Sequence, residues 1–297
     1  VAGMQEEYEA LRQALCDSIG LVMKQRSTYS LPNFVESEAF EPAFTLGALA
    51  HCGEMESFPR AWITATMDRY IEVLRSRRKH YATFVFAPYE LMMVPAFLRS
   101  GEKQWALDIL QFMLGCQRPA GWNQFSEVVA SPRRAPRNIG DMPHAWVGAE
   151  YIEAVRSLFV YEDGEQLVVG AGIDPAWLND GAVVSLANAP TGFGCIHLEE
   201  RAESNRIDVR LWGDARPPGG LLLKSPMDKV DGQEYWDGRA WQAVPAVGIR
   251  IDNLPAELTI RKVNVGARNE NKTDVPVGVD PSGGIYVCGG GKLQPSA

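Results

Sequence analysis

The stretch IDVRLW, residues 207–212, decides how the second half of the chain is interpreted. Its apolar residues alternate with charged ones, which is the pattern of a β-strand that buries one face. Shorter runs of the same kind, LVV at 167–169 and IHL at 196–198, are separated from it by turn residues. Further along, YWDGRAW at 235–241 predicts a hairpin, because Asp-Gly tolerates the positive φ angles of a two-residue turn. Residues 163–266 are therefore predicted to form an antiparallel β-sandwich.

Residues 1–162 follow a helical period instead. Their apolar side chains recur every three or four residues, which predicts six helices, or three helical hairpins. The expected helices cover residues 4–24, 37–52, 57–74, 88–99, 102–116 and 143–161. The tail, residues 267–297, is rich in Gly, Asn and Pro and is expected to be extended or partly disordered. The sequence thus predicts a multidomain α+β protein.

Composition limits the classes of function. The 297 residues are 46% hydrophobic and 22% charged, as in a soluble globular protein with a sizeable core. The net charge is -8 and no basic block is long enough to follow a phosphate backbone, so no nucleic-acid partner is expected. No run of about 18 apolar residues and no signal peptide is recognised, which predicts no membrane partner and leaves the compartment open between cytoplasm and periplasm. Five scattered cysteines without zinc spacing predict free thiols, and no metal or cofactor is implied.

Two neighbouring segments carry the chemistry. They are GWNQFSEVV at 121–129 and GDMPHAW at 140–146, and they lie mostly outside the predicted helices. Together they supply two tryptophans, two amides, two carboxylates and a histidine within about 25 residues. Aromatic rings stack on sugar faces, amides bond to hydroxyl groups, and carboxyl groups exchange protons with a glycosidic oxygen or with water. The two segments therefore predict a carbohydrate site.

These segments resemble the C-terminal half of bacterial six-hairpin glycosidases, in particular the α-L-rhamnosidase-like proteins. The resemblance includes YEL at 89–91 and AFLRSGE at 96–102, and GIDPAWL at 172–178 is similar to the family's junction into its C-terminal sandwich. It covers roughly residues 30 to 265. It implies a partial (α/α)6 toroid over residues 1–162, followed by the antiparallel β-sandwich. The implied activity is hydrolysis of an α-L-rhamnoside or a related sugar.

The resemblance also implies roles for individual residues. Glu127 would be the general base that activates water, and Asp141 would orient either partner. His144 would bind a substrate hydroxyl, and Trp122 and Trp146 would line the sugar site. Two further residues, Asn123 and Glu90, complete the expected substrate-binding set.

The resemblance does not assign the general acid of an inverting enzyme to a residue of this chain. It faces the base across a gap of roughly 6.5–9.5 Å. In the family it lies well over a hundred residues before the base, and only 126 residues precede Glu127. The acid is therefore expected outside this chain, unless Glu38, Glu41 or Glu90 has taken its role, with Glu41 the preferred substitute. An incomplete toroid also predicts a partner, either another copy of the chain or an upstream polypeptide.

Each site residue also has a structural interpretation. Glu127 could be a helix cap or the partner of Arg118. Asp141 stands where an N-cap of the last predicted helix would be. His144 could simply pack or face solvent in the first turn of that helix. Outside this set, Trp236 and Trp241 flank the predicted turn and are expected to stack across the hairpin, with a carbohydrate-binding platform as the alternative.

Two other classes of function remain open. The first is a non-catalytic carbohydrate-binding or assembly module with an incomplete active site. The second is a helical scaffold that binds protein and uses the sandwich as a spacer. A second carboxyl facing Glu127 at the inverting distance favours hydrolysis, whereas a lone Glu127 in an open groove favours binding.

Overall fold

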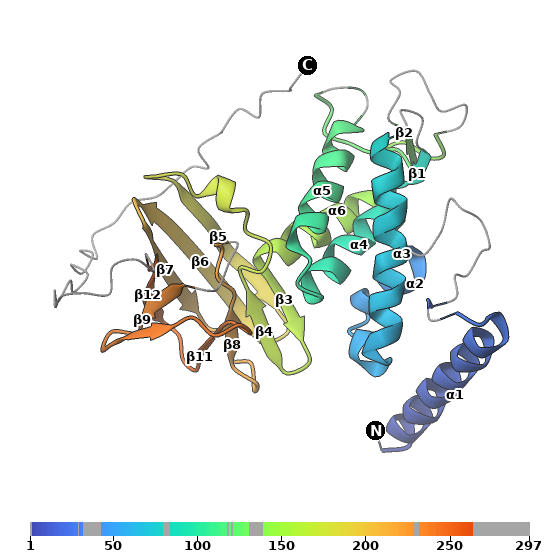
Figure 1. Ribbon diagram of the computed structural model, residues 1–297, viewed down its shortest axis with the longest axis horizontal. Coiled ribbons are helices and arrows are strands. Elements are labelled where there is room, and N and C mark those ends of the chain that lie inside the picture. Colours follow the sequence, from blue (N-terminus) through green and yellow to red (C-terminus); the bar gives the residue numbers. More distant parts are fainter. Residues whose placement is uncertain are drawn as a thin grey trace. The chain divides into compact units, whose positions relative to one another are not determined.

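The computed structural model describes residues 2–28, 30–31, 43–79, 84–117, 119, 121–130, 139–227 and 232–263. The chain divides into two units, Val1–Val263 and Asn264–Ala297, and every described residue lies in the first. That unit is an α+β structure in which the α-helices precede the two larger sheets along the chain, with two short strands between helices (Figure 1). The tail predicted at 267–297 lies outside the described residues.

The helices agree with the sequence pattern to within a few residues at most of their ends. They are α1 (Ala2–Arg26), α2 (Ala43–His51), α3 (Arg60–Lys79), α4 (Ala87–Arg99), α5 (Lys103–Gly115) and α6 (Ala145–Phe159). The first part of the helix expected at 37–52 lies outside the described residues. Two short 3-10 helices, η1 (Met55–Ser57) and η2 (Pro175–Trp177), complete the set in the described part of the chain. No helix among the described residues is long and apolar enough to cross a membrane.

Helix α4 is the centre of the helical part. It packs against α2, α5 and α6, and its residues are buried on every side, among them Leu91, Met93 and Phe97 (Figure 1). A helix that is apolar all round belongs in a core. The backbones of α2 and α4 come close at Gly47, where a Cβ would lie 2.7 Å from the Cβ of Met92.

The strands form two larger sheets. The six-stranded sheet has the order β10-β9-β12-β7-β6-β5 and is antiparallel throughout, whereas the four-stranded sheet, β11-β8-β4-β3, contains one parallel pair, β4 with β8. Their bounds are β3 (Val160–Asp163), β4 (Gln166–Val169), β5 (Val183–Thr191), β6 (Gly194–Glu203), β7 (Arg206–Gly213), β8 (Leu221–Leu223), β9 (Gln233–Trp236), β10 (Trp241–Ala243), β11 (Ile249–Ile251) and β12 (Ala256–Lys262). Both sheets contribute side chains to one cluster of buried apolar residues.

The alternation that predicted the strands is visible in β7. Ile207, Val209 and Leu211 are buried, while the charged residues between them point away from the core. The predicted hairpin is also present as β9 and β10, with Trp236 opposite Trp241 and their ring centroids 5.7 Å apart. Its connection has four residues rather than the expected two, and the carboxylate of Asp237 accepts hydrogen bonds from two backbone N–H groups in it.

A small sheet that the sequence pattern did not predict positions the candidate site. Strand β1 (Phe84–Phe86) pairs antiparallel with β2 (Val128–Ala130). Immediately beyond this pair, the backbone N–H of Ala87 donates to the carbonyl oxygen of Glu127 at 2.8 Å. The loop that carries Glu127 is thereby attached to the start of α4.

Candidate functional site

The two sequence motifs lie side by side because their backbones are hydrogen-bonded to each other. The N–H of Glu127 donates to the carbonyl oxygen of Asp141 at 3.0 Å, and the N–H of Val128 donates to that of Ile139 at 3.0 Å. One turn further on, the N–H of His144 donates to the carbonyl oxygen of Phe125 at 3.2 Å. Three bonds of this kind fix residues 139–144 against residues 125–128.

Gly140 allows the closest approach between the two segments. Its φ angle is +63°, a left-handed value that side chains with a Cβ rarely adopt. A Cβ at this position would lie 2.8 Å from the Cβ of Glu127 and would overlap its Oε2 atom. The carboxylate of Glu127 therefore occupies the space that any other residue at 140 would need.

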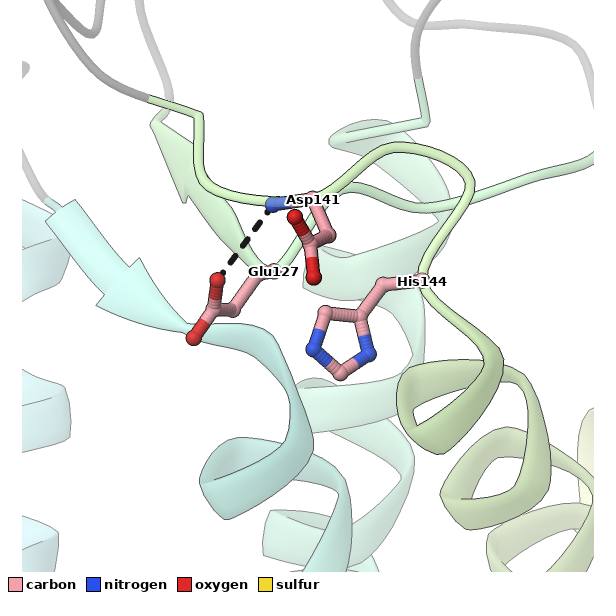
Figure 2. A group of neighbouring side chains, drawn as sticks. All are labelled: Glu127, Asp141 and His144. Carbon is pink, nitrogen blue, oxygen red and sulfur yellow. Dashed lines mark hydrogen bonds between the residues drawn. The ribbon is translucent and has the colours of Figure 1, made fainter.

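Glu127, Asp141 and His144 form one group of side chains (Figure 2). Each offers an oxygen or nitrogen atom, and these atoms all lie within 4.8 Å of one another. The Oε2 atom of Glu127 accepts a hydrogen bond from the backbone N–H of Asp141 at 3.3 Å. Glu127 and His144 are half-buried and Asp141 is exposed, so the group opens to solvent.

His144 is the N-cap of α6. Its Nδ1 atom accepts a hydrogen bond from the backbone N–H of Val147 at 3.3 Å. The interpretation of Asp141 as the cap is therefore wrong, because the backbone of Asp141 is bonded to Glu127 three residues before the N-cap. Since Nδ1 is an acceptor, a neutral imidazole carries its proton on Nε2 and presents a donor there.

The hydrogen bond on Nδ1 of His144 affects which ligands the three side chains can bind. Two carboxylates and an imidazole are donor types that divalent cations accept. In the present geometry, however, the Nδ1 lone pair is bonded to Val147 and Nε2 carries the proton, so the neutral ring has no lone pair free for a metal. The arrangement fits an oxygen-rich ligand better, because it combines one N–H donor with two carboxylate acceptors.

An aromatic row adjoins the group at His144. The ring of Trp146, which is 41% exposed, has its centroid 6.1 Å from that of His144 and 5.5 Å from that of Tyr89. Tyr89 in turn contacts Phe44 and Phe86, with centroids 5.1 and 6.1 Å away. Of this row, His144 and Trp146 were predicted from the sequence as site residues, and Tyr89 was part of the YEL segment that carries the resemblance. The signal for Tyr89 was its place in the first turn of the helix expected at 88–99.

Trp122 and Asn123 lie in the loop before Glu127. The Trp122 side chain is 67% exposed, and within the described residues its ring contacts no other aromatic ring. Asn123 has a φ angle of +51°, a conformation that asparagine tolerates better than most residues. An exposed indole with free faces is suited to stacking against a ligand.

Glu90 lies in a different environment from the rest. It is only 3% exposed on α4, and its Oε2 atom accepts a hydrogen bond from the hydroxyl of Tyr70 at 2.5 Å. Its substrate-binding role stays a prediction, now for a carboxyl group inside the helical core. Glu38, Glu41 and Arg118 lie outside the described residues.

A groove elsewhere on the helical part was not anticipated. It has a volume of about 680 Å³ and lies between η1, α3 and the end of α4, with Phe58, Met67 and Arg99 among its lining residues. It includes none of the three clustered side chains. The lining of the groove contains carboxylates but no histidine, so the Glu127 group remains the better candidate for chemistry.

Comparison with known protein families, with curated proteins and with solved structures finds no match for this chain. The resemblance to six-hairpin glycosidases therefore rests on the residues quoted above.

Proposed function

We propose that the protein is a glycoside hydrolase-like protein that acts on an α-L-rhamnoside or a related sugar by inversion, with Glu127 as general base. In this proposal the helices are part of an (α/α)6 toroid, and the two larger sheets are the two layers of a β-sandwich. The rest of the toroid comes from a second copy or from an upstream polypeptide.

The observation that carries the proposal is the fixed position of the Glu127 carboxylate. Gly140 packs against it and the Asp141 N–H donates to it, while the His144 ring lies in the same group. In the reaction Glu127 would take a proton from water as the water oxygen attacks the anomeric carbon. The Nε2 proton of His144 would donate to a sugar hydroxyl, and the exposed face of Trp146 would pack on the ring.

Asp141 does not fit the role of the general acid. Its nearest oxygen lies within 4.8 Å of that of Glu127, whereas an inverting pair is separated by roughly 6.5–9.5 Å. We therefore assign Asp141 to positioning. The proton for the departing glycosidic oxygen would come from Glu41, outside the described residues, or from the polypeptide that completes the toroid.

The positions of Asp141 and Glu90 favour the second candidate, a carbohydrate-binding module without hydrolysis. Asp141 is too close to Glu127 for the inverting acid, and Glu90 is buried against Tyr70. A site with only a base would bind a sugar and not cleave it.

The test is hydrolysis of a panel of nitrophenyl glycosides by the wild type, by Glu127→Gln and by the control Glu257→Gln. Glu257 is a side chain on β12 that is 69% exposed. We expect a rate loss of about 10²-fold or more for Glu127→Gln and none for the control. A proton NMR spectrum taken early in the reaction should show the product with inverted configuration.

Three results would contradict the proposal. Equal rates for wild type and Glu127→Gln would remove Glu127 from the mechanism. A retained configuration would exclude inversion. Sugar binding measured by calorimetry without any hydrolysis would select the binding module instead.

A further inference from the structure

Helix α1 exposes an apolar stripe. Met4, Leu11 and Leu15 are 75%, 73% and 51% exposed, and Tyr8 lies between them on the same face. Positions 4, 8, 11 and 15 alternate spacings of four and three residues, which is the seam of a coiled coil. Of the α1 side chains that the structure describes, only Met23 is buried.

The helix is attached to its own chain through a neighbouring face. The Nε atom of Arg12 donates to the hydroxyl of Ser57 at 3.1 Å and lies 3.4 Å from a carboxylate oxygen of Glu54. Cys16 and Ile19 pack against the helical core from the same side. The hydroxyl of Tyr8 also donates to a carboxylate oxygen of Glu54. These contacts leave Met4, Leu11 and Leu15 exposed, although most helical stability in proteins comes from packing an apolar face.

The spacing of the stripe allows it to pair with the stripe of a second copy. If a second α1 runs in the opposite direction and the two cross at residue 13, Leu11 faces Leu15 of the other copy. Met4 then faces Val22, and Tyr8 faces Ser18. We propose that two copies of the chain associate by antiparallel pairing of their α1 helices. This inference uses no residue of the candidate site, so it can fail without contradicting the proposed role of Glu127.

The charges of α1 select the antiparallel direction. The first half of the helix carries Glu6, Glu7 and Glu9, and the last turn carries Lys24 and Arg26. With the crossing at residue 13, Lys24 lies about one turn from Glu6 and Glu7 of the other copy, although Glu9 then faces Asp17. Parallel pairing would place like charges together at both ends, which is unfavourable.

The association is tested by the mass of the full chain in solution, measured by light scattering at tens of micromolar. We expect twice the chain mass of 32.8 kDa for the wild type and for Ile152→Lys. Ile152 is the matched control, a 69% exposed apolar residue on α6. Leu11→Lys with Leu15→Lys should reduce the mass to that of one chain. A monomeric wild type, or a double variant that stays dimeric, would overturn the inference.

The direction is tested by crosslinking, which leaves Leu11 and Leu15 in place. The background is Cys52→Ser, because Cys52 is an exposed free thiol. Under mild oxidation, Met4→Cys with Val22→Cys should give a dimer whose disulfide joins residues 4 and 22 by mass spectrometry. Met4→Cys alone should give none. A disulfide between two copies of residue 4 would show parallel pairing and overturn the proposed direction.

Discussion

Glu127 and Glu200 are two glutamates whose surroundings differ in nearly every respect. Glu127 lies at the start of β2, half-buried, with an N–H donor on its carboxylate and an opening to solvent. Glu200 lies in the middle of β6, has no exposed surface, and neither of its oxygens has a hydrogen-bond partner among the described residues. The loop at Glu127 holds a solvent-accessible carboxylate in a defined position, whereas the interior at β6 buries the carboxyl group of Glu200 without bonding to it.

This comparison shows that a carboxyl group with a shifted pKa is not by itself evidence of a functional site. Burial raises the pKa of Glu200 to about 8, and the charge of the Lys103 ammonium only partly opposes this. Lys103 is itself bonded to the carbonyl oxygens of Ile173 and Pro226, at 3.2 and 3.0 Å. A strongly shifted pKa in a cleft can mark a functional residue. Glu200 has a shifted pKa but no access to solvent, whereas Glu127 is accessible to solvent.

The largest expected effect concerns Glu200 and stability. Its pKa is near 4.5 in the unfolded chain and about 8 in the folded one, so the folded state binds the proton more tightly. The stability that this proton provides is complete below about pH 4.5 and is lost as the pH rises to about 8. Relative to Glu200→Gln, the wild type should therefore lose about 4 kcal/mol of unfolding free energy across this range.

Urea denaturation of both proteins at several pH values measures that difference. The control is Glu199→Gln, the preceding residue on the opposite face of β6, paired with Arg201 at 3.4 Å. It should leave the pH profile of the wild type unchanged. A Glu200→Gln profile parallel to that of the wild type would mean that Glu200 is ionised and compensated in the folded protein.

The next effect concerns the position of Glu127. In Gly140→Ala the new Cβ would overlap the carboxylate and force it away from its place. If the chain hydrolyses glycosides, a displacement of about 1 Å should lower kcat/KM by about 10²-fold. Gly121→Ala is the matched control, because Gly121 also has a positive φ angle, +84°, but nothing lies within 4 Å of its Cβ position.

Both variants carry the same kind of backbone strain, about 1–2 kcal/mol. Gly140→Ala adds the clash with the Cβ of Glu127, so its melting temperature should fall further than that of Gly121→Ala. The comparison is therefore made on the hydrolysis rate per folded molecule. Equal rates for Gly140→Ala and Gly121→Ala would show that the position of the Glu127 carboxylate does not matter for turnover.

The sequence predicted the elements whose signals are local. The helix expected at 102–116 is α5 at Lys103–Gly115, because an apolar period and a preceding glycine are both visible within one segment. Strands β1 and β2 were missed, because each has only three residues and its partner lies more than forty positions away. No local pattern encodes such a pair.

The burial of Glu200 could have been predicted from the alternation of residues in β6. In β6 the residues on the inward face are Ile196, Leu198, Glu200 and Ala202. A period of two therefore places this glutamate inside the core, and the same alternation predicted the strand itself. At the candidate site the sequence brought Glu127, Asp141 and His144 together by motif. It could not show which of them caps α6, because that depends on backbone bonds across the loop.

The smallest effect concerns His144, which serves both structure and the proposed site. His144→Ala removes the acceptor for the Val147 N–H and should lower the unfolding free energy by about 1 kcal/mol. His144→Asn should keep most of that stability, because asparagine is a favoured N-cap. Both variants lose the imidazole Nε2 donor, so both should bind or cleave a sugar less well. Denaturation that finds Asn as destabilising as Ala would show that the hydrogen bond to Val147 does not hold the start of α6.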